Sequence, residues 1–424
     1  MSVAANPSKY TNLRPARARS LGRFLAVLGP GIVVMLADTD VGSVITAGQS
    51  GVQWGYRLLL LQLVLIPILF MVQELTVRLG IFTGRGHGEL IRDTFGPAWA
   101  WVSAGGLGVA TVGALLTEFS GVAGVGEMYG VPRWASLPLA AVALLAVVLT
   151  GSYRRVELVA IAVGLFEFAF FYIAWAAHSD PHALVSGALS IPFANKEYLY
   201  LAAANIGAVI MPWMIFYQQS AVADKKLRPE HLAPARWDTA IGAVVTQLVM
   251  AAILVACAAT IGRTSPTATL STVGDMSHAL TPFLGPDVGS AVYGAGVLGA
   301  GMVAAIVVSL AFAWGLGEVA GYRRSLEYRP LQARWFYGVY AASVVGGCVV
   351  VGLWPNLVSL NVGVQVMNAL LLPLVLGFLI ALARRALPAA QRLRGVYFWV
   401  VLSVAALTCA LGVFGGFSGA GVLG

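Results

Sequence analysis

The sequence predicts an all-α polytopic membrane protein. Its 424 residues are 59% hydrophobic and only 10% charged, with a mean hydropathy of +0.83, whereas a soluble domain carries about 25% charged residues. Long apolar segments recur along the whole chain, and lysine and arginine concentrate in alternate connections between them. The net charge of +8 is therefore a matter of membrane topology and does not indicate a nucleic-acid partner.

Eleven segments are long enough to span a bilayer. A spanning helix needs about 20 predominantly apolar residues. The segments that meet this requirement are 24–46, 54–79, 98–128, 133–151, 156–177, 199–222, 238–262, 287–318, 335–354, 364–383 and 395–416. The basic segment 1–23 is interpreted as a retained cytoplasmic tail, because the apolar segment after it is long and lacks a clear cleavage signature.

The basic residues test this count of spans. With the N-terminus inside, 22 of the 26 lysines and arginines fall in predicted cytoplasmic segments. The exceptions are Arg57, Arg133, Lys196 and Arg263. Cytoplasmic loops carry such an excess of positive charge, so we expect an integral protein of the plasma (inner) membrane, with its N-terminus in the cytoplasm and its C-terminus outside.

Two of the predicted spans contain a break. The first holds Asp38 and Asp40 in "LADTDVGS", where Gly42 weakens the helix. The sixth holds Pro212 in "NIGAVIMPWM", which should break the helix near residues 209–211. An ionised aspartate at the bilayer centre costs about 2.5–3.5 kcal/mol on insertion scales. A carboxylate beside carbonyls freed by an unwound turn would form an oxygen-rich cation site that compensates this cost.

The position of the breaks predicts the organisation of the chain. Broken helices at corresponding positions of two halves mark the midplane site of transporters with inverted repeats. We therefore expect a five-plus-five inverted repeat, although no sequence identity between the halves is visible. The expected parts are a first repeat at 24–177, an external loop at 178–198, a second repeat at 199–383, and an additional eleventh helix with the C-terminus at 395–424.

The other acids, the cysteines and the histidines are expected to have structural roles. The acids Glu74, Glu167 and Glu318 lie near the ends of predicted spans and are expected to be paired structural acids or to form interhelical hydrogen bonds. The three cysteines, Cys257, Cys348 and Cys409, lie in apolar runs without ligand spacing and are expected to be packing residues. Histidines 178, 182 and 278 fall in predicted external loops, and no histidine lies within a span, which disfavours a histidine-based zinc or haem site.

At the two breaks the sequence resembles the Nramp family (natural-resistance-associated macrophage proteins), which transports divalent metals. The stretch "GPGIVVMLADTDVGSVITAGQSGVQWGYRLL" is similar to the family's first helix and following turn, and "RLGIFTGRGHGELIRDTFG" is similar to the segment after its second helix. Residues 29–96 and 204–220 carry the specific part of the resemblance. It implies a LeuT-like fold with discontinuous helices 1 and 6, and a transporter, not an enzyme.

The resemblance also implies a set of metal ligands. Asp40 matches the metal-binding aspartate of the family, and Ala37 matches a neighbouring carbonyl donor. Ala208 and Met211 match the family's A-x-x-M pair, which supplies a carbonyl and a thioether. Gln365 matches a glutamine that approaches the ion in occluded forms.

Several positions depart from the family pattern. Ser43 replaces the asparagine ligand of the usual DPGN, and "MPWM" lacks the histidine and asparagine of MPHN. Glu118 stands where the family has an aspartate used in its proton route, whereas Thr111 and Gly121 stand where further acids are usual. Because a proton relay needs titratable groups at short intervals, proton coupling is expected to be weak or absent. These departures resemble a magnesium-transporting branch of the family.

The sequence leaves the identity of the ion open. The thioether of Met211 favours Mn²⁺, Fe²⁺ and similar ions. Ser43 and the additional Asp38 favour Mg²⁺, which is typically held by one or two carboxylates through retained waters. Asp38 and Asp40 are about 200° apart around an ideal helix, so they share a pocket only if the helix unwinds.

The predicted function is secondary transport of a divalent metal cation by alternating access. No cofactor, nucleic-acid partner or obligate protein partner is expected, and the surroundings are the lipid bilayer. The main alternative is an organic-solute (amino-acid) transporter of the same architecture. A channel is a further alternative, as is an intramembrane enzyme, although the chain has no HExxH or GxSxG motif.

Overall fold

The structure is a computed structural model that describes residues 29–265, 270, 273–274, 277, 285–354 and 360–419. Within these ranges the regular secondary structure is entirely helical, as predicted. The expected tail at 1–23, the first residues of the first span, His278 and the last residues of the chain lie outside the described residues.

The first half of the chain begins with α2 (Pro30–Asp38), α3 (Val41–Trp54), α4 (Leu59–Thr83), α5 (His87–Phe95), α6 (Pro97–Met128), α7 (Arg133–Val148), α8 (Tyr153–Gly164) and α9 (Ala169–Ala176). Short 3₁₀ turns, η1 (Gly55–Leu58) and η2 (Leu165–Phe168), precede α4 and join α8 to α9. The predicted external loop at 178–198 contains a further helix, α10 (Pro181–Ala188), of which no residue is buried.

The second half repeats the order of a broken helix followed by long helices. It consists of α11 (Lys196–Val209), α12 (Pro212–Asp224), the turn η3 (Pro229–His231), α13 (Leu232–Ala259), α14 (Ile261–Thr264), α16 (Pro286–Ala320), α17 (Arg334–Leu353) and α18 (Asn361–Arg385). An additional helix, α19 (Gly395–Gly419), ends the described chain.

The long apolar helices of the structure agree with the membrane class that the sequence predicts. Nine helical stretches among the described residues are long and apolar enough to cross a membrane. Every predicted span overlaps a helix or a pair of helices. The number eleven is not established, because α7 has only 16 residues and α2 is described only from Pro30.

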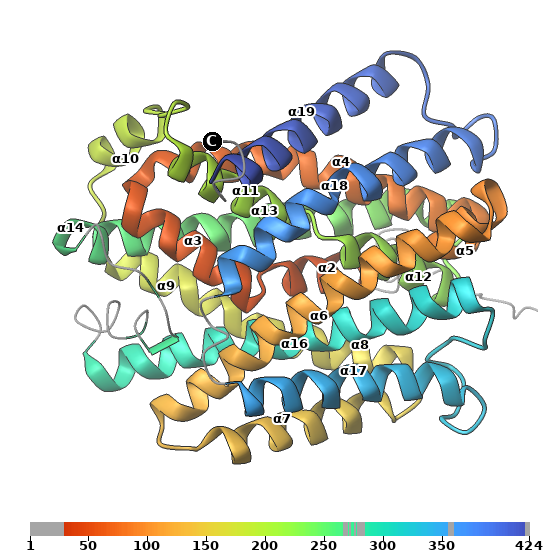
Figure 1. Cartoon of the computed structure of the whole chain (residues 1–424), viewed down its shortest axis with the longest axis horizontal. Helices are drawn as coiled ribbons and strands as arrows, with labels where there is room; N and C mark the ends of the chain where they lie inside the picture. Colours follow the sequence, from red (N-terminus) through yellow and green to blue (C-terminus); the bar gives the residue numbers. More distant parts are fainter. Residues whose placement is uncertain are drawn as a thin grey trace, which may run out of the picture.

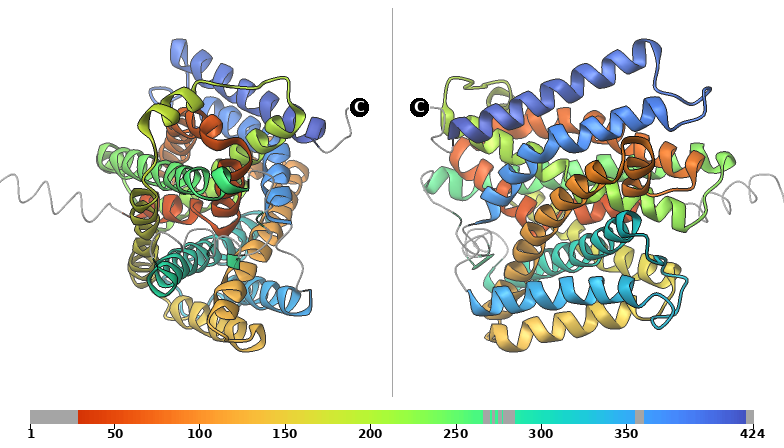
Figure 2. Two further views of the ribbon diagram at one scale, coloured as in Figure 1. Left: turned by 90° about the vertical axis from the view of Figure 1, so that its left-hand side faces the viewer. Right: turned by 45° about the vertical axis from the view of Figure 1, so that its right-hand side comes forward.

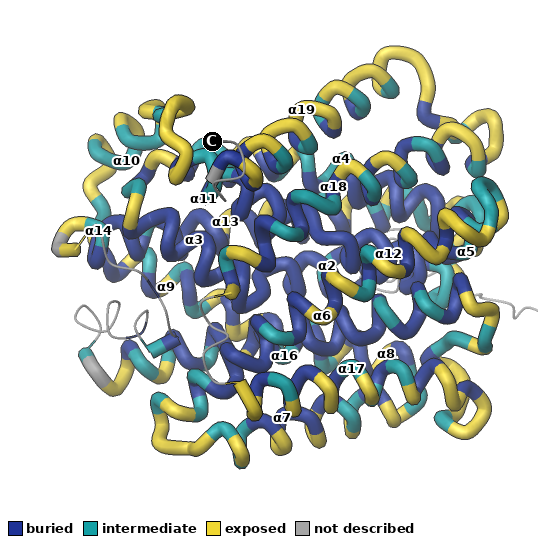
Figure 3. Tube along the Cα trace, in the orientation of Figure 1, coloured by how far each residue is buried: buried dark blue, intermediate teal, exposed yellow. Residues whose placement is uncertain are grey.

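The helices around the two breaks form the interior. Helix α13 packs against α2, α3 and α4, and α16 packs against α6, α12 and α17. Helices α7 and α17 lie side by side at one edge of the molecule, and α18 and α19 at the other (Figures 1 and 2). Buried residues concentrate on α2, α3 and the helices next to them (Figure 3). The breaks therefore lie in the most shielded part of the bundle.

The outer helices carry large apolar side chains on their exposed faces. Examples are Trp101, Val112, Leu139, Phe166, Trp175, Val349, Trp399 and Leu407. A soluble monomer rarely exposes apolar surface on this scale, but the hydrocarbon of a bilayer covers it without cost. The chain is an integral membrane protein.

Most of the described basic residues lie at the end of the bundle that holds α5, which we call the α5 end; the exceptions are Arg57, Arg133, Lys196 and Arg263. Ion pairs join them to acids of neighbouring elements: Arg236 lies 2.6 Å from Glu74, and Lys225 lies 2.7 Å from Glu157. Helices α10 and α14 and the C-terminal end of α19 lie at the opposite, α10 end (Figure 1). The basic residues of the described chain are thus concentrated at one end of the bundle, as the sequence predicts.

Candidate functional site

The first break separates α2 from α3 at Thr39 and Asp40. Asp40 has an extended backbone (φ −69°, ψ 167°) and caps α3, because its Oδ1 accepts the Ser43 N–H at 2.6 Å. The Val41 N–H donates to Glu118 Oε2 on α6 at 3.1 Å. In a continuous helix this N–H would bond to the Ala37 carbonyl. The Ala37 carbonyl is therefore freed from helical pairing at the end of α2.

The second break frees a carbonyl for a different reason. The partner of the Ala208 carbonyl in a continuous helix would be the N–H of residue 212, which is a proline and has none. Ile210 and Met211 adopt non-helical conformations between α11 and α12. The Ala208 carbonyl instead accepts the Ser43 hydroxyl at 3.0 Å. One hydrogen bond thus joins the two breaks.

A third element, α18, approaches both breaks through Gln365. Its Nε2 lies 3.4 Å from Asp40 Oδ1, and its Oε1 accepts from Asn368 Nδ2 at 3.0 Å. A Cβ at Gly42 would come within 2.3 Å of Gln365 Nε2, and one at Gly207 within 1.8 Å of the Gln365 carbonyl oxygen. Glycine at these two positions allows α3, α11 and α18 to converge.

The structure brings together most of the residues that the sequence singled out. Hydrogen bonds link Asp40, Ser43, Ala208 and Gln365 into one cluster, and all four are completely buried. Met211 is also completely buried and is the N-cap residue of α12. The cluster contains carboxylate, hydroxyl, amide and carbonyl oxygens, with a thioether three residues beyond Ala208.

Asp38 stands apart from this cluster. It is the last residue of α2, is buried, and neither of its carboxylate oxygens has a hydrogen-bond partner in the described chain. It is close enough to Asp40 and Glu167 for their charges to repel. The helix break therefore brings Asp38 near the cluster without joining it to Ser43 or Ala208.

The predicted position of Glu167 near the end of a span was wrong. We expected a paired acid or an interhelical hydrogen bond near the end of a span, but the carboxyl group is buried at the first break. It interacts there with the Thr39 side chain, although neither oxygen meets the strict hydrogen-bond geometry with a described partner. The turn η2, which interrupts α8 and α9, places it there. The pattern of apolar residues in the sequence did not show that the turn carrying Glu167 would face the first break.

The other two acids are satisfied, as expected. Glu74 pairs with Arg78 at 2.7 Å and with Arg236 at 2.6 Å. Glu318 accepts the Ser220 hydroxyl at 2.5 Å and the Gly88 N–H at 2.8 Å. Both belong to the α5 end and lie away from the breaks.

The charge around the first break is not balanced by protein groups. Four buried carboxyl groups gather there, those of Asp38, Asp40, Glu118 and Glu167. In the described part of the chain, no lysine, arginine or histidine lies within ion-pair distance of any of them. An uncompensated charge in a low-dielectric interior costs several kcal/mol. Protons or a bound cation must supply the missing positive charge.

The described residues hold no cluster of three or more histidine, cysteine, aspartate or glutamate side chains suited to a metal ion. An ion at the breaks would therefore depend on backbone carbonyls, a hydroxyl, an amide and a thioether as well as on carboxylate. Oxygen ligands of this kind suit Mg²⁺ and Mn²⁺, and a thioether suits softer ions.

The site is closed toward both ends of the bundle. Toward the α10 end, Asn205 accepts from Gln62 at 2.6 Å and donates to Ser50 at 2.8 Å. Toward the α5 end, the rings of Tyr217 and Trp314 meet with centroids 5.5 Å apart. The carboxyl groups at the first break are accordingly buried from both ends in this structure.

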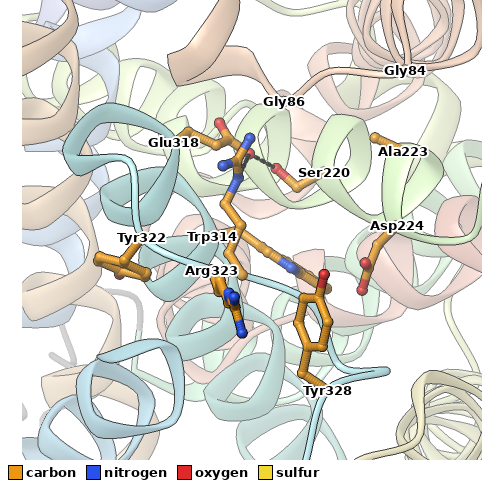
Figure 4. A pocket seen from close by; sticks show the side chains of 11 residues that line it. Gly84, Gly86, Ser220, Ala223, Asp224, Trp314, Glu318, Tyr322, Arg323 and Tyr328 are labelled. Atoms are coloured by element: carbon orange, nitrogen blue, oxygen red, sulfur yellow. Dashed lines mark hydrogen bonds and ion pairs between the residues drawn. The ribbon is translucent and has the colours of Figure 1, made fainter. Parts of the chain in front are cut away.

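Beyond Trp314 a cavity of about 300 Å³ opens at the α5 end. Figure 4 shows the Glu318–Ser220 hydrogen bond on one of its walls and Asp224 and Tyr328 on another. The walls come from α12, α16, the segment that follows α16 and the turn between α4 and α5. The buried Tyr217–Trp314 contact separates this cavity from the breaks.

A membrane bundle with its polar centre at two interrupted helices is the architecture of a secondary transporter with inverted repeats. Residues 31–418 match the Nramp family, described as natural resistance-associated macrophage protein-like. The chain belongs to this family, whose members are membrane transporters and not enzymes. The family membership inferred from the sequence is confirmed.

Two relatives illustrate the range of similarity. A divalent metal cation transporter, MntH, from Aeromonas hydrophila subsp. hydrophila is 31% identical over 297 residues, which cover 68% of this chain and 72% of the relative. The protein of the same name from Acidiphilium cryptum is 28% identical over 390 residues, with 88% and 86% covered.

Solved structures show the same fold. A manganese transporter of Eremococcus coleocola, in complex with an aromatic bis-isothiourea substituted compound, aligns with a TM-score of 0.75 at 19% identity, covering 96% of this chain and 88% of that one. The inward-facing conformation of Mhp1 aligns with a TM-score of 0.58 at 15% identity, covering 93% and 89%. The predicted all-α fold with two discontinuous helices is confirmed.

Proposed function

We propose that this chain moves a divalent metal cation across the membrane by alternating access, with the ion bound between the two helix breaks. The proposed ligands are the Asp40 carboxylate, the carbonyls of Ala37 and Ala208, the Ser43 hydroxyl, the Gln365 side chain and the Met211 sulfur. One observation carries the proposal: the buried Asp40 carboxylate has an oxygen without a partner and is linked through Ser43 to the freed Ala208 carbonyl.

Charge compensation favours a cation as the cargo. A dication replaces the missing positive charge beside Asp40, and the freed carbonyls at the ends of α2 and α11 direct their negative dipole ends toward it. The Ser43–Ala208 and Gln365–Asp40 contacts join the proposed ligands to one another in the absence of an ion. When an ion binds, its contacts with these ligands replace the two hydrogen bonds, and the backbone at both breaks keeps its conformation.

The names of the relatives agree with this cargo. MntH proteins are described as divalent metal cation transporters, and the aligned Eremococcus coleocola structure is described as a manganese transporter. An organic-solute transporter would instead need a balanced polar pocket, and four carboxyl groups without a described cationic partner disfavour it.

We propose an ion of the Mn²⁺ class as the first candidate, because Met211 is completely buried and begins α12 at the second break. Mg²⁺ is the second candidate. The observation that favours it is the unpartnered Asp38 carboxylate near the site, which suits an ion that keeps part of its water shell.

The direction of transport is proposed to be inward, toward the α5 end as the cytoplasmic face. The membrane potential contributes about 2.3 kcal/mol per charge per 100 mV, so a dication gains about twice that. Release toward the α5 end requires Tyr217 and Trp314 to separate, which would connect the breaks to the cavity of Figure 4.

The test is metal uptake into proteoliposomes that contain the purified protein or its Asp40→Asn variant. Asparagine caps a helix about as well as aspartate, so we expect the variant to fold with an unchanged melting temperature. Removing the charge should reduce Mn²⁺ and Mg²⁺ uptake by about 100-fold or more, in the range of losing a buried charged ligand. Glu127→Gln, which removes an acid that pairs with Arg133 at the α10 end, is the matched control and should transport normally.

Uptake by Asp40→Asn at the parent rate would show that the ion binds elsewhere. Uptake of a labelled amino acid by the parent, without metal uptake, would favour the organic-solute alternative. Calorimetric competition between Mg²⁺ and Mn²⁺ on the purified protein then ranks the two candidate ions.

A further inference from the structure

A second cavity, of about 530 Å³, lies between α6, α7 and α16, and α8 and η2 also contribute to its walls. We call it the α7 cavity. Its walls are apolar except for Tyr129 and Ser136, and none of the proposed ion ligands lines it. The lining residues come from the second half of α6 and from the first halves of α7 and α16. The cavity therefore lies in the half of the bundle nearer the α10 end.

Small residues leave this space open. The gap between α7 and α16 is lined by three alanines, Ala140, Ala143 and Ala295. Two close contacts bound it. A Cβ at Gly126 of α6 would lie 2.9 Å from the Ser136 Cβ of α7. A Cβ at Gly299 of α16 would lie 2.9 Å from the Phe166 Cβ of η2. Because the elements already touch at these glycines, they cannot move together to fill the cavity.

The α7 cavity faces the bilayer. Three of its lining residues have large exposed side chains: Leu139 is 71% exposed, Phe166 56% and Tyr129 55%. Helix α7 itself lies at an edge of the molecule (Figure 1). An apolar cavity does not hold ordered water, and an empty one of this size would weaken the packing of the bundle. The occupant that the surroundings supply is a lipid acyl chain.

Polar donors lie at the α10 end of the α7 cavity. Arg133, one turn before Ser136 on α7, pairs with Glu127 at 2.6 Å through Nη2, and its Nε donates to the same carboxylate at 2.8 Å. A guanidinium has five N–H donors, and no described residue accepts from the Arg133 Nη1. The Ser136 hydroxyl also has no hydrogen-bond partner in the described chain. Such donors suit phosphate and ester oxygens.

We propose that the α7 cavity binds one acyl chain of a phospholipid from the leaflet at the α10 end, with the lipid phosphate at Arg133 and its ester region at Ser136. The site is separate from the ion site, and the proposal does not depend on transport. Phe166 lines the cavity and directly precedes Glu167, which is buried at the first break. A bound chain therefore supports the turn η2 that places Glu167 there.

The first test maps lipid contacts of the parent protein in phosphatidylcholine vesicles. A small share of the lipid carries a diazirine near the end of one acyl chain, and the adducts formed on illumination are located by mass spectrometry of peptides. We expect about tenfold more adduct on Met302, inside the cavity, than on Leu407, which is exposed on α19, because a bound chain has the higher occupancy. Equal yields at the two residues would overturn the proposal.

The second test fills the cavity from opposite walls with Ala143→Phe and Ala295→Phe. We expect the adduct yield on Met302 to fall about tenfold, because the two rings occupy the space of the chain. Ala146→Phe adds the same ring to an exposed position of α7 outside the cavity and is the matched control. An unchanged yield in the folded double variant would overturn the proposal, and the map of the parent decides the question if that variant does not fold.

The headgroup assignment has its own test. Arg133→Gln should lower the yield on Met302 about threefold, because the phosphate loses a charged partner. Glu127→Gln keeps the guanidinium and should not lower it. An unchanged yield in Arg133→Gln would refute a phosphate at this residue. Suppression of the labelling by unlabelled oleate, but not by unlabelled phosphatidylcholine, would identify a free fatty acid as the occupant and overturn the assignment to a phospholipid.

The support of η2 is measured by thermal unfolding in detergent. Adding phosphatidylcholine to the delipidated protein should raise the melting temperature of the parent and of Ala146→Phe, since a ligand that binds only the folded chain stabilises it. The double variant should gain less, because its cavity is already filled. An equal gain in all three proteins would show that lipid in the cavity does not stabilise the fold.

Discussion

At the scale of single residues, Asp40 combines two roles. One of its carboxylate oxygens caps α3 through the Ser43 N–H, and the other has no partner. Capping fixes the direction of the side chain, so the free oxygen is oriented before any ion arrives. Ser43 also has two roles, because its N–H donates to the Asp40 carboxylate and its hydroxyl donates to the Ala208 carbonyl.

Met211 is the residue that should separate soft ions from hard ones. We expect Met211→Ala to weaken binding of Mn²⁺ and Cd²⁺ by about tenfold, since a lost ligand of the softer type costs about 1.4 kcal/mol or more, and to change Mg²⁺ binding little. Isothermal titration calorimetry with the three ions measures the difference. Equal losses for all three would mean that the sulfur makes no contact with the ion, and Met214→Ala, which truncates another buried methionine of α12, is the packing control.

At the scale of elements, each break has a local cause and a distant support. Pro212 withholds the N–H that would pair with the Ala208 carbonyl, and Ser43 on α3 supplies a replacement. At the first break, Glu118 on α6 takes the Val41 N–H. Each broken helix is thus stabilised by a group from an element that is distant in the sequence.

Pro212→Ala should therefore restore helical pairing and weaken the site. The alanine N–H can bond to the Ala208 carbonyl, so the carbonyl is withdrawn from the ion. We expect metal affinity to fall about tenfold, corresponding to about 1.4 kcal/mol, while the melting temperature stays the same or rises. Pro67→Ala, in the middle of α4 on its exposed side, is the matched control. The idea fails if both variants bind metal as the parent does.

Helix α5 contains a buried histidine that should make the protein sensitive to acid. His87 is completely buried against α12, with Nδ1 3.0 Å from Gln219 Oε1, and burial lowers its pKa to about 4. Above a pH of about 6.5 the ring is neutral in both folded and unfolded chains. Between about 6.5 and 4 the unfolded chain binds a proton that the folded chain does not, so the free energy of unfolding falls as the pH falls, by about 3 kcal/mol in all.

His87→Gln removes this proton uptake. We expect the variant to lose less thermal stability than the parent when the pH is lowered from about 7.5 to about 5 in detergent. Differential scanning fluorimetry at both pH values measures the difference. An equal acid loss in parent and variant would assign the sensitivity to other groups.

At the scale of the whole molecule, the closure of both ends of the bundle is related to the charge of the carboxyl groups at the first break. The four carboxyl groups at the first break are tolerable in a sealed interior only with protons or a cation beside them. Neither face reaches them directly, because Asn205 closes one side and the Tyr217–Trp314 contact closes the other. Transport then requires the two sides to open in turn.

Proton coupling can be tested on the same preparation. Glu118 accepts the Val41 N–H and the Thr117 hydroxyl at 3.0 Å and lies beside the Asp40 carboxyl group, but Thr111 and Gly121 are not titratable and cannot continue a proton relay beyond it. We therefore expect metal influx into proteoliposomes to bring little acidification, as read by an internal pH dye. Glu118→Gln, which keeps an acceptor for Val41, should retain uptake, whereas Glu118→Ala should lose it together with stability by about 1–3 kcal/mol. Stoichiometric proton entry that Glu118→Gln abolishes would make Glu118 a relay.

The sequence by itself determined the membrane class, the order of the helices and the position of both breaks. These features follow from local chemistry: runs of apolar residues, the missing N–H of Pro212, and an aspartate followed by glycine. It also predicted Asp40, Ser43, Ala208 and Gln365 as ligands, through a resemblance to the family to which the chain belongs.

Only the tertiary structure decided which distant groups complete these elements. Glu118 caps one break and Asp238 caps α2 across 77 and 207 residues of chain, and Glu167 comes to lie beside Thr39 and not at the end of a span. A hydrogen bond between residues so far apart leaves no periodic trace in one sequence, because it depends on how the helices cross. The folded bundle alone sets those crossings, and with them the charge that surrounds the proposed ion.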